Sequence, residues 1–225
     1  MRRATRWDSR VLSYLTLRQA IGCLGIVLPF ALAAGNRLFF SGGLQESVSD
    51  YFYTGMRGLL VGGMCVIGAF LLAHHGDDRW DRVLTKAAGA GAIGVGLFPT
   101  PPDHPTLPQA ILGYCHFASG GLMFSSLAVI ALWLFRRADP QARRNRLRQL
   151  RNSIYLACGV VMVAALALAG VAALPLAAAL SHLDLVFWME TAASAAFGVS
   201  WLVKGHALLR DRRPLRVPAP PGTGA

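Results

Sequence analysis

The chain alternates between long apolar blocks and short polar or charged segments. Six apolar blocks can be distinguished, at about residues 14–35, 54–75, 84–98, 111–135, 154–174 and 184–203. A helix of about 20 mainly apolar residues crosses the hydrocarbon core of a bilayer. The apolar residues come in blocks rather than at an amphipathic spacing, which indicates a membrane protein. We therefore predict an all-α polytopic bundle of six transmembrane helices.

The six blocks form one transmembrane domain, 14–205, between a basic N-terminal segment, 1–13, and a tail, 206–225. The tail begins basic and becomes rich in Pro and Gly, a composition typical of disorder. Because the first block follows a basic start, it could also be a signal peptide. It is longer than the 7–15 residues of a signal peptide's apolar region, so we predict a retained helix.

The composition agrees with a membrane protein and argues against a nucleic-acid-binding domain and against a disulfide-bonded or zinc-finger protein. Hydrophobic residues make up 54% of the chain and charged residues 15%, whereas a soluble domain carries about 25% charged residues. The net charge of +11 comes from arginines between the apolar blocks, so no folded basic domain is left to bind nucleic acid. The four cysteines lie inside apolar blocks without CxxC spacing, which excludes a disulfide framework or zinc finger.

The distribution of Lys and Arg predicts the orientation. Of the 22 basic residues, 19 lie in the N-terminal segment, at 79–86, at 136–151 and from residue 204 onward. Six spans place all four of these segments on one side of the membrane, and Lys and Arg are enriched on the cytoplasmic side. We predict cytoplasmic termini and, as localisation, multi-pass insertion in the bacterial inner (plasma) membrane.

Three ionisable residues then fall within apolar blocks near the outer face, because the second, fourth and sixth blocks all begin there. These residues are Arg57, His116 and Glu190. A charge at the centre of a membrane helix costs about 2.5–3.5 kcal/mol, so such residues normally face the bundle and pair. We expect Arg57 to pair with Glu190, with His116 between them.

Three interpretations of this polar cluster remain open: a structural clamp, a pocket for a lipid headgroup or small ligand, and a catalytic site. We favour a non-enzymatic role, with a membrane-embedded lipid hydrolase as the alternative. The ligand-binding candidates are Arg57, Glu190, His116, Tyr53, Ser194 and Asp50. For catalysis the candidates are His116, Asp50 and Ser47.

No cofactor is predicted, and zinc would accompany only the enzyme interpretation. His104, His116 and His182 fall on the correct side of the membrane. No two of them have the i, i+4 spacing that places two ligands on one helix face. A metal site is therefore not predicted.

Glycines predict how the helices pack. Gly58 and Gly62 form a small-xxx-small pair, which lets helix backbones approach closely in lipid. The third block carries Gly89, Gly91, Gly94 and Gly96 among alanines, as expected of a slender, tightly packed helix. The expected partners are membrane lipids, and the glycine-rich faces are also compatible with a homo-oligomer.

Three stretches of the chain resemble one family of bacterial six-span membrane proteins, classed as a domain of unknown function. They are the Ser-Val-Ser-Asp-Tyr-Phe-Tyr-Thr-Gly-Met-Arg block at 47–57, Leu-Phe-Pro-Thr at 97–100, and Phe-Gly-Val-Ser-Trp-Leu-Val-Lys-Gly at 197–205 with Glu190 upstream. The resemblance covers about residues 15 to 205 and implies a fold but no activity. The chain is more remotely similar to the superfamily of alkaline ceramidases and progestin-type receptors. It lacks that group's paired HxxxH and seventh span, so the resemblance implies no zinc amidase site.

Overall fold

The computed structural model describes residues 4–74, 78–137, 146–172 and 184–205, and within these ranges every regular element is a helix. The α-helices are α1 (Ala4–Phe40), α2 (Arg57–Ala73), α3 (Arg79–Leu97), α4 (Leu107–Val129), α5 (Arg146–Ala172) and α6 (Leu185–Lys204). A short 3₁₀ helix, η1 (Ser49–Tyr53), precedes α2, and a π-helix, η2 (Ile130–Leu134), continues α4. The predicted all-α class is confirmed for the described part of the chain.

Four segments are long and apolar enough to cross a membrane, as expected of a membrane protein. They are Leu15–Phe40, Leu107–Leu134, Arg146–Val171 and Leu185–Lys204. Of the other two helices, α2 is apolar but has only 17 residues, and α3 has 19 residues with charged side chains in its first turn.

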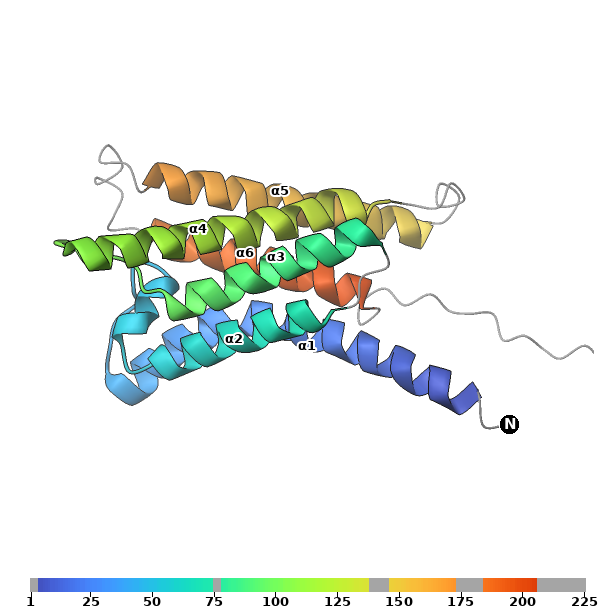
Figure 1. Cartoon of the computed structure of the whole chain (residues 1–225), viewed down its shortest axis with the longest axis horizontal. Helices are drawn as coiled ribbons and strands as arrows, with labels where there is room; N and C mark the ends of the chain where they lie inside the picture. Colours follow the sequence, from blue (N-terminus) through green and yellow to red (C-terminus); the bar gives the residue numbers. More distant parts are fainter. Residues whose placement is uncertain (1–3, 75–77, 138–145, 173–183, 206–225) are drawn as a thin grey trace, which may run out of the picture.

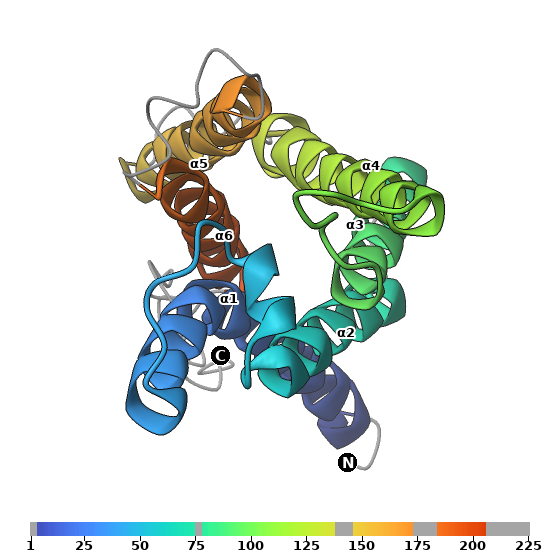
Figure 2. The same cartoon turned by 90° about the vertical axis from the view of Figure 1, so that its left-hand side faces the viewer.

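The six α-helices stand in a ring (Figure 2). Each helix contacts its neighbours in the sequence, and α6 closes the ring against α1. Helices α2, α4 and α6 begin at the end where η1 lies, which we call the η1 end, and α3 and α5 begin at the opposite end (Figure 1). The α1–α2 and α4–α5 contacts are less extensive than the other four. The ring therefore consists of two tightly packed groups, α1–α6–α5 and α2–α3–α4.

Glycines allow the backbones within each group to touch. A Cβ atom on Gly198 of α6 would lie 2.5 Å from the carbonyl oxygen of Gly22 on α1. A Cβ on Gly68 of α2 would lie 2.8 Å from the carbonyl oxygen of Gly89 on α3. Because real Cβ atoms do not approach so closely, a side chain at these positions would force the helices apart.

The two glycine predictions have different outcomes. Helix α3 is tightly packed as predicted, since a Cβ on Gly91 would lie 2.7 Å from the carbonyl oxygen of Ser119 on α4. The prediction for Gly58 and Gly62 is wrong within one copy of the chain, because neither glycine has an atom within 4 Å of its Cβ position. Both glycines are exposed, on the outer surface of α2. The predicted homo-oligomer stays a prediction.

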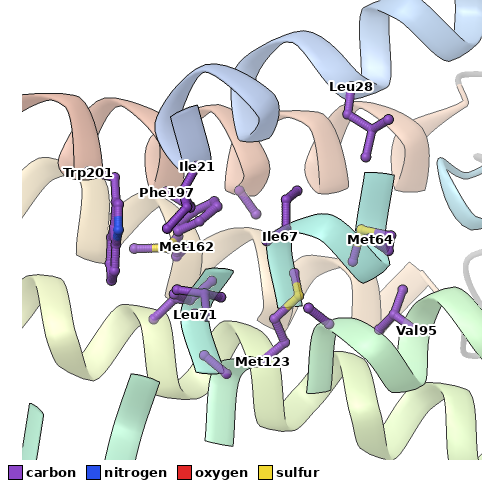
Figure 3. Close-up of a cluster of buried hydrophobic side chains, with 14 of the residues drawn as sticks. Ile21, Leu28, Met64, Ile67, Leu71, Val95, Met123, Met162, Phe197 and Trp201 are labelled. Atoms are coloured by element: carbon purple, nitrogen blue, oxygen red, sulfur yellow. The ribbon is translucent and has the colours of Figure 1, made fainter. Parts of the chain in front are cut away.

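A cluster of buried apolar side chains lies between the helices (Figure 3). At the opposite end, aromatic rings close this interior. The ring of Trp201 lies 5.0 Å from that of Phe135 and 5.2 Å from that of Phe197, measured between centroids. Phe135 also lies 5.2 Å from Tyr155 of α5. These contacts join α6, α5 and the end of η2, so the two groups of helices meet there without a gap.

Some helix bounds differ from the prediction. Helix α1 begins at Ala4, α3 at Arg79 and α5 at Arg146, each ahead of the apolar block it carries. Arg and Lys are good helix formers, so a basic flank extends a helix beyond its apolar part. At α3 the N-cap is Asp78, whose carboxylate accepts the backbone N–H of Asp81 at 2.8 Å. The tail from residue 206 lies outside the described residues.

Candidate functional site

A cavity of about 880 Å³ occupies the η1 end of the ring. All six α-helices contribute to its walls, and the segment 45–50 and Tyr53 lie at its mouth. Its inner walls are apolar, with Leu60 and Met64 from α2, Val95 from α3, and Met123 from α4. Polar side chains also line it: Ser47, Ser49, Asp50, Tyr53, Thr100, His116, Glu190 and Ser194. The cavity is therefore amphipathic, with both polar and apolar walls.

Glu190 fastens the start of η1 to α6. Its Oε2 accepts the backbone N–H of Val48 at 2.7 Å. The backbone N–H of Phe187, also on α6, donates to the carbonyl oxygen of Glu46 at 2.8 Å. A hydrogen bond to a carboxylate is roughly twice as strong as a neutral one. The carboxylate of Glu190 thus holds a backbone segment over the cavity.

The other end of η1 is bound to the connection between α3 and α4. The hydroxyl of Thr100 donates to Oδ1 of Asp50 at 2.8 Å, and the hydroxyl of Tyr53 donates to the carbonyl oxygen of Thr100. Burial, and secondarily the nearby Asp50 carboxylate, raises the pKa of Tyr53. The phenol therefore stays protonated and remains a donor. Together with Glu190, these bonds make η1 a bridge between the two groups of helices.

His116 is buried, with 5% of its surface exposed, and lines the cavity from α4. Its Nδ1 donates to the carbonyl oxygen of Phe98 at 2.7 Å. That bond places the proton of the neutral imidazole on Nδ1 and leaves Nε2 as an acceptor. Within the described ranges, no hydrogen bond engages Nε2. His116 is thus an oriented acceptor in the cavity wall.

Arg57 does not meet Glu190, and the predicted pair is wrong. The guanidinium of Arg57 is exposed and lies 4.0 Å from the centre of the Phe52 ring. It lines a separate surface depression of about 320 Å³ with Gly58 and Leu97. The physical reason is the start of α2: Arg57 is its first residue, so the side chain reaches the surface instead of lying within the helix span. Glu190 takes a backbone N–H as its partner instead.

The remaining candidates divide between structural and surface positions. Ser194 lines the cavity, but its hydroxyl donates to the carbonyl oxygen of Gly25 at 2.6 Å and so joins α6 to α1. Ser47 is buried, and its Oγ accepts the backbone N–H of Asp50 at 3.0 Å. His104 is exposed, whereas His182 lies outside the described residues. Among the residues that the structure describes, no three His, Cys, Asp or Glu side chains are placed to hold a metal ion.

Helix α5 was missed as a wall of the site. Its sequence near the cavity is entirely small or apolar, so it offered no polar residue as a signal. Ala165, Leu166 and Gly170 of α5 line the cavity opposite Phe117 of α4. Phe117 is 56% exposed and Leu166 is 38% exposed. Phe117 and Leu166 flank the cavity where α4 lies beside α5, and we call this place the α4–α5 portal.

Comparisons of the chain with protein-family models, with curated proteins and with solved structures find no match.

Proposed function

We propose that the chain is a six-span membrane protein of the bacterial inner membrane that binds an amphipathic molecule in the cavity, with both termini in the cytoplasm. The polar group of this molecule lies at Ser47–Tyr53 and its apolar part lies among the buried side chains of the helices. Binding without chemical conversion is the role that we favour. The sequence block at 47–57, which resembles the six-span family, lies at this mouth, but the proposal does not depend on the resemblance.

Helix lengths are compatible with six spans. The 19 residues of α3 extend about 28 Å at 1.5 Å per residue, close to the roughly 30 Å hydrocarbon core. Helix α2 is shorter, and η1 lies in front of it. Irregular backbone is tolerated at membrane depth where it is buried in protein or lines a cavity. Glu190 satisfies one backbone group at the start of η1, because its carboxyl group accepts the N–H of Val48.

The uneven distribution of Lys and Arg supports the orientation. The starts of α1, α3 and α5 and the end of α6, where these residues concentrate, lie away from η1. Cytoplasmic enrichment of basic residues then places η1 and the cavity mouth at the outer side of the membrane.

The observation that carries the proposal is the amphipathic cavity together with its portal. A volume of about 880 Å³ lies within the 300–1,000 Å³ typical of small-molecule sites. The α4–α5 portal is framed by Phe117 and Leu166, which would face lipid in a bilayer. An amphipathic molecule can therefore enter sideways from the outer leaflet without its apolar part crossing water.

A fluorescent reporter inside the cavity tests binding. With Phe124→Trp as the reporter, an alkyl chain that carries bromine should quench the new tryptophan, and an unlabelled competitor should reverse the quenching. Phe124 lines the cavity from α4. Quenching that never saturates and that no competitor reverses would mean that the reporter senses only bulk lipid, against the proposal.

Two alanines of α5 provide a matched pair for this assay. Ala165 lines the cavity and is 4% exposed, whereas its neighbour Ala164 is exposed on the outer surface. Ala165→Phe should abolish saturable binding because the added ring fills the cavity, and Ala164→Phe should leave binding unchanged. Equal binding by both variants would contradict a site inside the ring.

A membrane-embedded lipid hydrolase is the second candidate, favoured by the orientation of His116. Its Nδ1–H bond to a carbonyl leaves Nε2 facing the cavity, as a general base requires. Zinc in stoichiometric amount, lost together with ester or amide hydrolysis in His116→Ala, would support the enzyme. A metal-free protein that binds amphiphiles and leaves them intact would support binding alone.

A further inference from the structure

We infer that the cavity selects an amphiphile whose head group is a protonated amine, a cation that also donates hydrogen bonds. This inference rests on the proposed function and adds the chemical class of the ligand. Three observations carry it: the sign of the charges around the cavity, the hydrogen-bonding character of its polar groups, and the position of Arg57.

The charged residues around the cavity are all acidic. Glu46, Asp50, Asp103 and Glu190 line it, and none of its described lining residues is Lys or Arg. The segment 173–183, which lies outside the described residues, contains neither residue in its sequence. An anionic head group would therefore meet only like charges, whereas a cation is attracted.

The polar atoms left for a ligand are acceptors. Oδ1 of Asp50 accepts from Thr100, and within the described part of the chain Oδ2 makes no hydrogen bond. Nε2 of His116 is an acceptor because Nδ1 holds the proton. His116 is almost fully buried, and a buried acceptor without a hydrogen bond costs free energy. A ligand that donates a hydrogen bond to Nε2 removes this cost. An ammonium group carries three N–H donors, while a sulfate or phosphate offers only acceptors.

Arg57 is not among the residues that line the cavity. Arg57 stacks on Phe52 and lines the neighbouring depression instead of the cavity. Had the Arg57–Glu190 pair formed, the cavity would hold a fixed cation. The unexpected position of Arg57 is thus what leaves the carboxylates available to a cationic ligand.

Four amphiphiles with the same twelve-carbon chain separate charge from hydrogen bonding: dodecylamine, dodecyltrimethylammonium, dodecanol and dodecyl sulfate. Each is titrated against the brominated probe on the Phe124→Trp protein in nanodiscs of neutral lipid at pH 7. The Ala165→Phe variant of the same protein gives the background from partition into the bilayer. We expect dodecylamine to displace the probe at a concentration at least about tenfold below that of dodecyl sulfate, or ~1.4 kcal/mol.

Asp50→Asn removes one charge and keeps an oxygen that can accept from Thr100. It should reduce the preference for dodecylamine over dodecyl sulfate severalfold and leave dodecanol binding unchanged. The matched control is Asp78→Asn, at the opposite end of the bundle, where Asn also serves as a helix N-cap. This control should keep the full preference.

The outcomes distinguish this inference from the proposed function. Equal displacement by all four amphiphiles, with saturable probe binding, would overturn charge selection and leave the binding function standing. Tighter binding of dodecyl sulfate would overturn it as well. Equal binding of dodecylamine and dodecyltrimethylammonium would overturn the requirement for N–H donors. Probe binding that is unsaturable in every case would contradict the proposed function itself.

Discussion

Removal of the Glu190 side chain should release η1 from the bundle. The carboxylate contacts a backbone N–H at the start of η1, and no side chain takes its place if it is lost. Glu190→Ala should therefore loosen the segment over the cavity more than the helices themselves. Local opening of this kind has its own free energy, below that of global unfolding.

The size of the effect follows from the bond. A hydrogen bond to a charged group contributes ~1.5–3 kcal/mol net, and an N–H left without its acceptor keeps the cost near the upper end. We therefore expect Glu190→Ala to destabilise the closed segment by ~2–3 kcal/mol, a rise of roughly 30- to 160-fold in the opening equilibrium. Glu190→Gln keeps an acceptor oxygen at 190. Its expected cost is ~1 kcal/mol, or roughly fivefold.

A buried cysteine in η1 measures this opening. Ser49 is 6% exposed, so in a Ser49→Cys protein a water-soluble maleimide reacts only after the segment opens. The four native cysteines are first replaced, since one of them is exposed: Cys23, Cys65, Cys115 and Cys158. The labelling rate should rise in the order parent, Glu190→Gln, Glu190→Ala. Glu46→Ala is the control, because Glu46 bonds to α6 through its backbone and its side chain is exposed.

Two results would refute this reasoning. The first is an unchanged labelling rate in Glu190→Ala, which would mean that the carboxylate does not hold η1. The second is a rate in Arg57→Met as high as in Glu190→Ala, as a clamp between the two side chains would require.

Three further predictions concern other contacts. The effects of Arg57→Met and Glu190→Ala on labelling should add within ~0.5 kcal/mol, because the two residues do not meet. A larger coupling energy would indicate that their side chains interact. Gly198→Ala should lower the free energy of unfolding in detergent by ~1–3 kcal/mol, since its Cβ would lie 2.5 Å from the Gly22 carbonyl oxygen. The control Gly121→Ala has open space around its Cβ and should be neutral or stabilising. Gly170→Leu should slow probe entry through the α4–α5 portal, while Gly62→Leu on the outer face of α2 should not, and equal rates would argue for another route.

The sequence predicted the all-α class and the six helices of the described chain. Blocks of apolar residues located these helices, and four of them are long and apolar enough to cross a membrane. The side on which His116 and Glu190 lie followed from counting helices, and the structure brings both to one cavity.

The partners of the polar residues could not be predicted, for two physical reasons. Glu190 bonds a backbone N–H, and every residue except proline has that group, so no residue type signals it. Arg57 was placed one turn too deep, because the 3₁₀ helix before α2 shifts the start of that helix. The opposite charges of Arg57 and Glu190 suggested an ion pair. Whether two such side chains meet depends on the rotation of each helix about its axis and on the depth of each residue, and hydropathy fixes neither. The walls supplied by α5 were missed since alanine and leucine carry no sign of facing a cavity.

The cavity and the bridge over it have a common cause. The groups α1–α6–α5 and α2–α3–α4 are each held by glycine crossings, and at the opposite end aromatic rings fill the space between them. At the η1 end, η1 connects the groups through Glu190 and Thr100, and its buried Tyr51 packs against Phe187 of α6 with ring centroids 6.3 Å apart. Polar bonds to a short backbone segment hold the groups together without filling the space below. If η1 restricts access from its own end, the α4–α5 portal becomes the expected route for a ligand. A bound amphiphile would then contact both groups, and its affinity should fall whenever η1 is released.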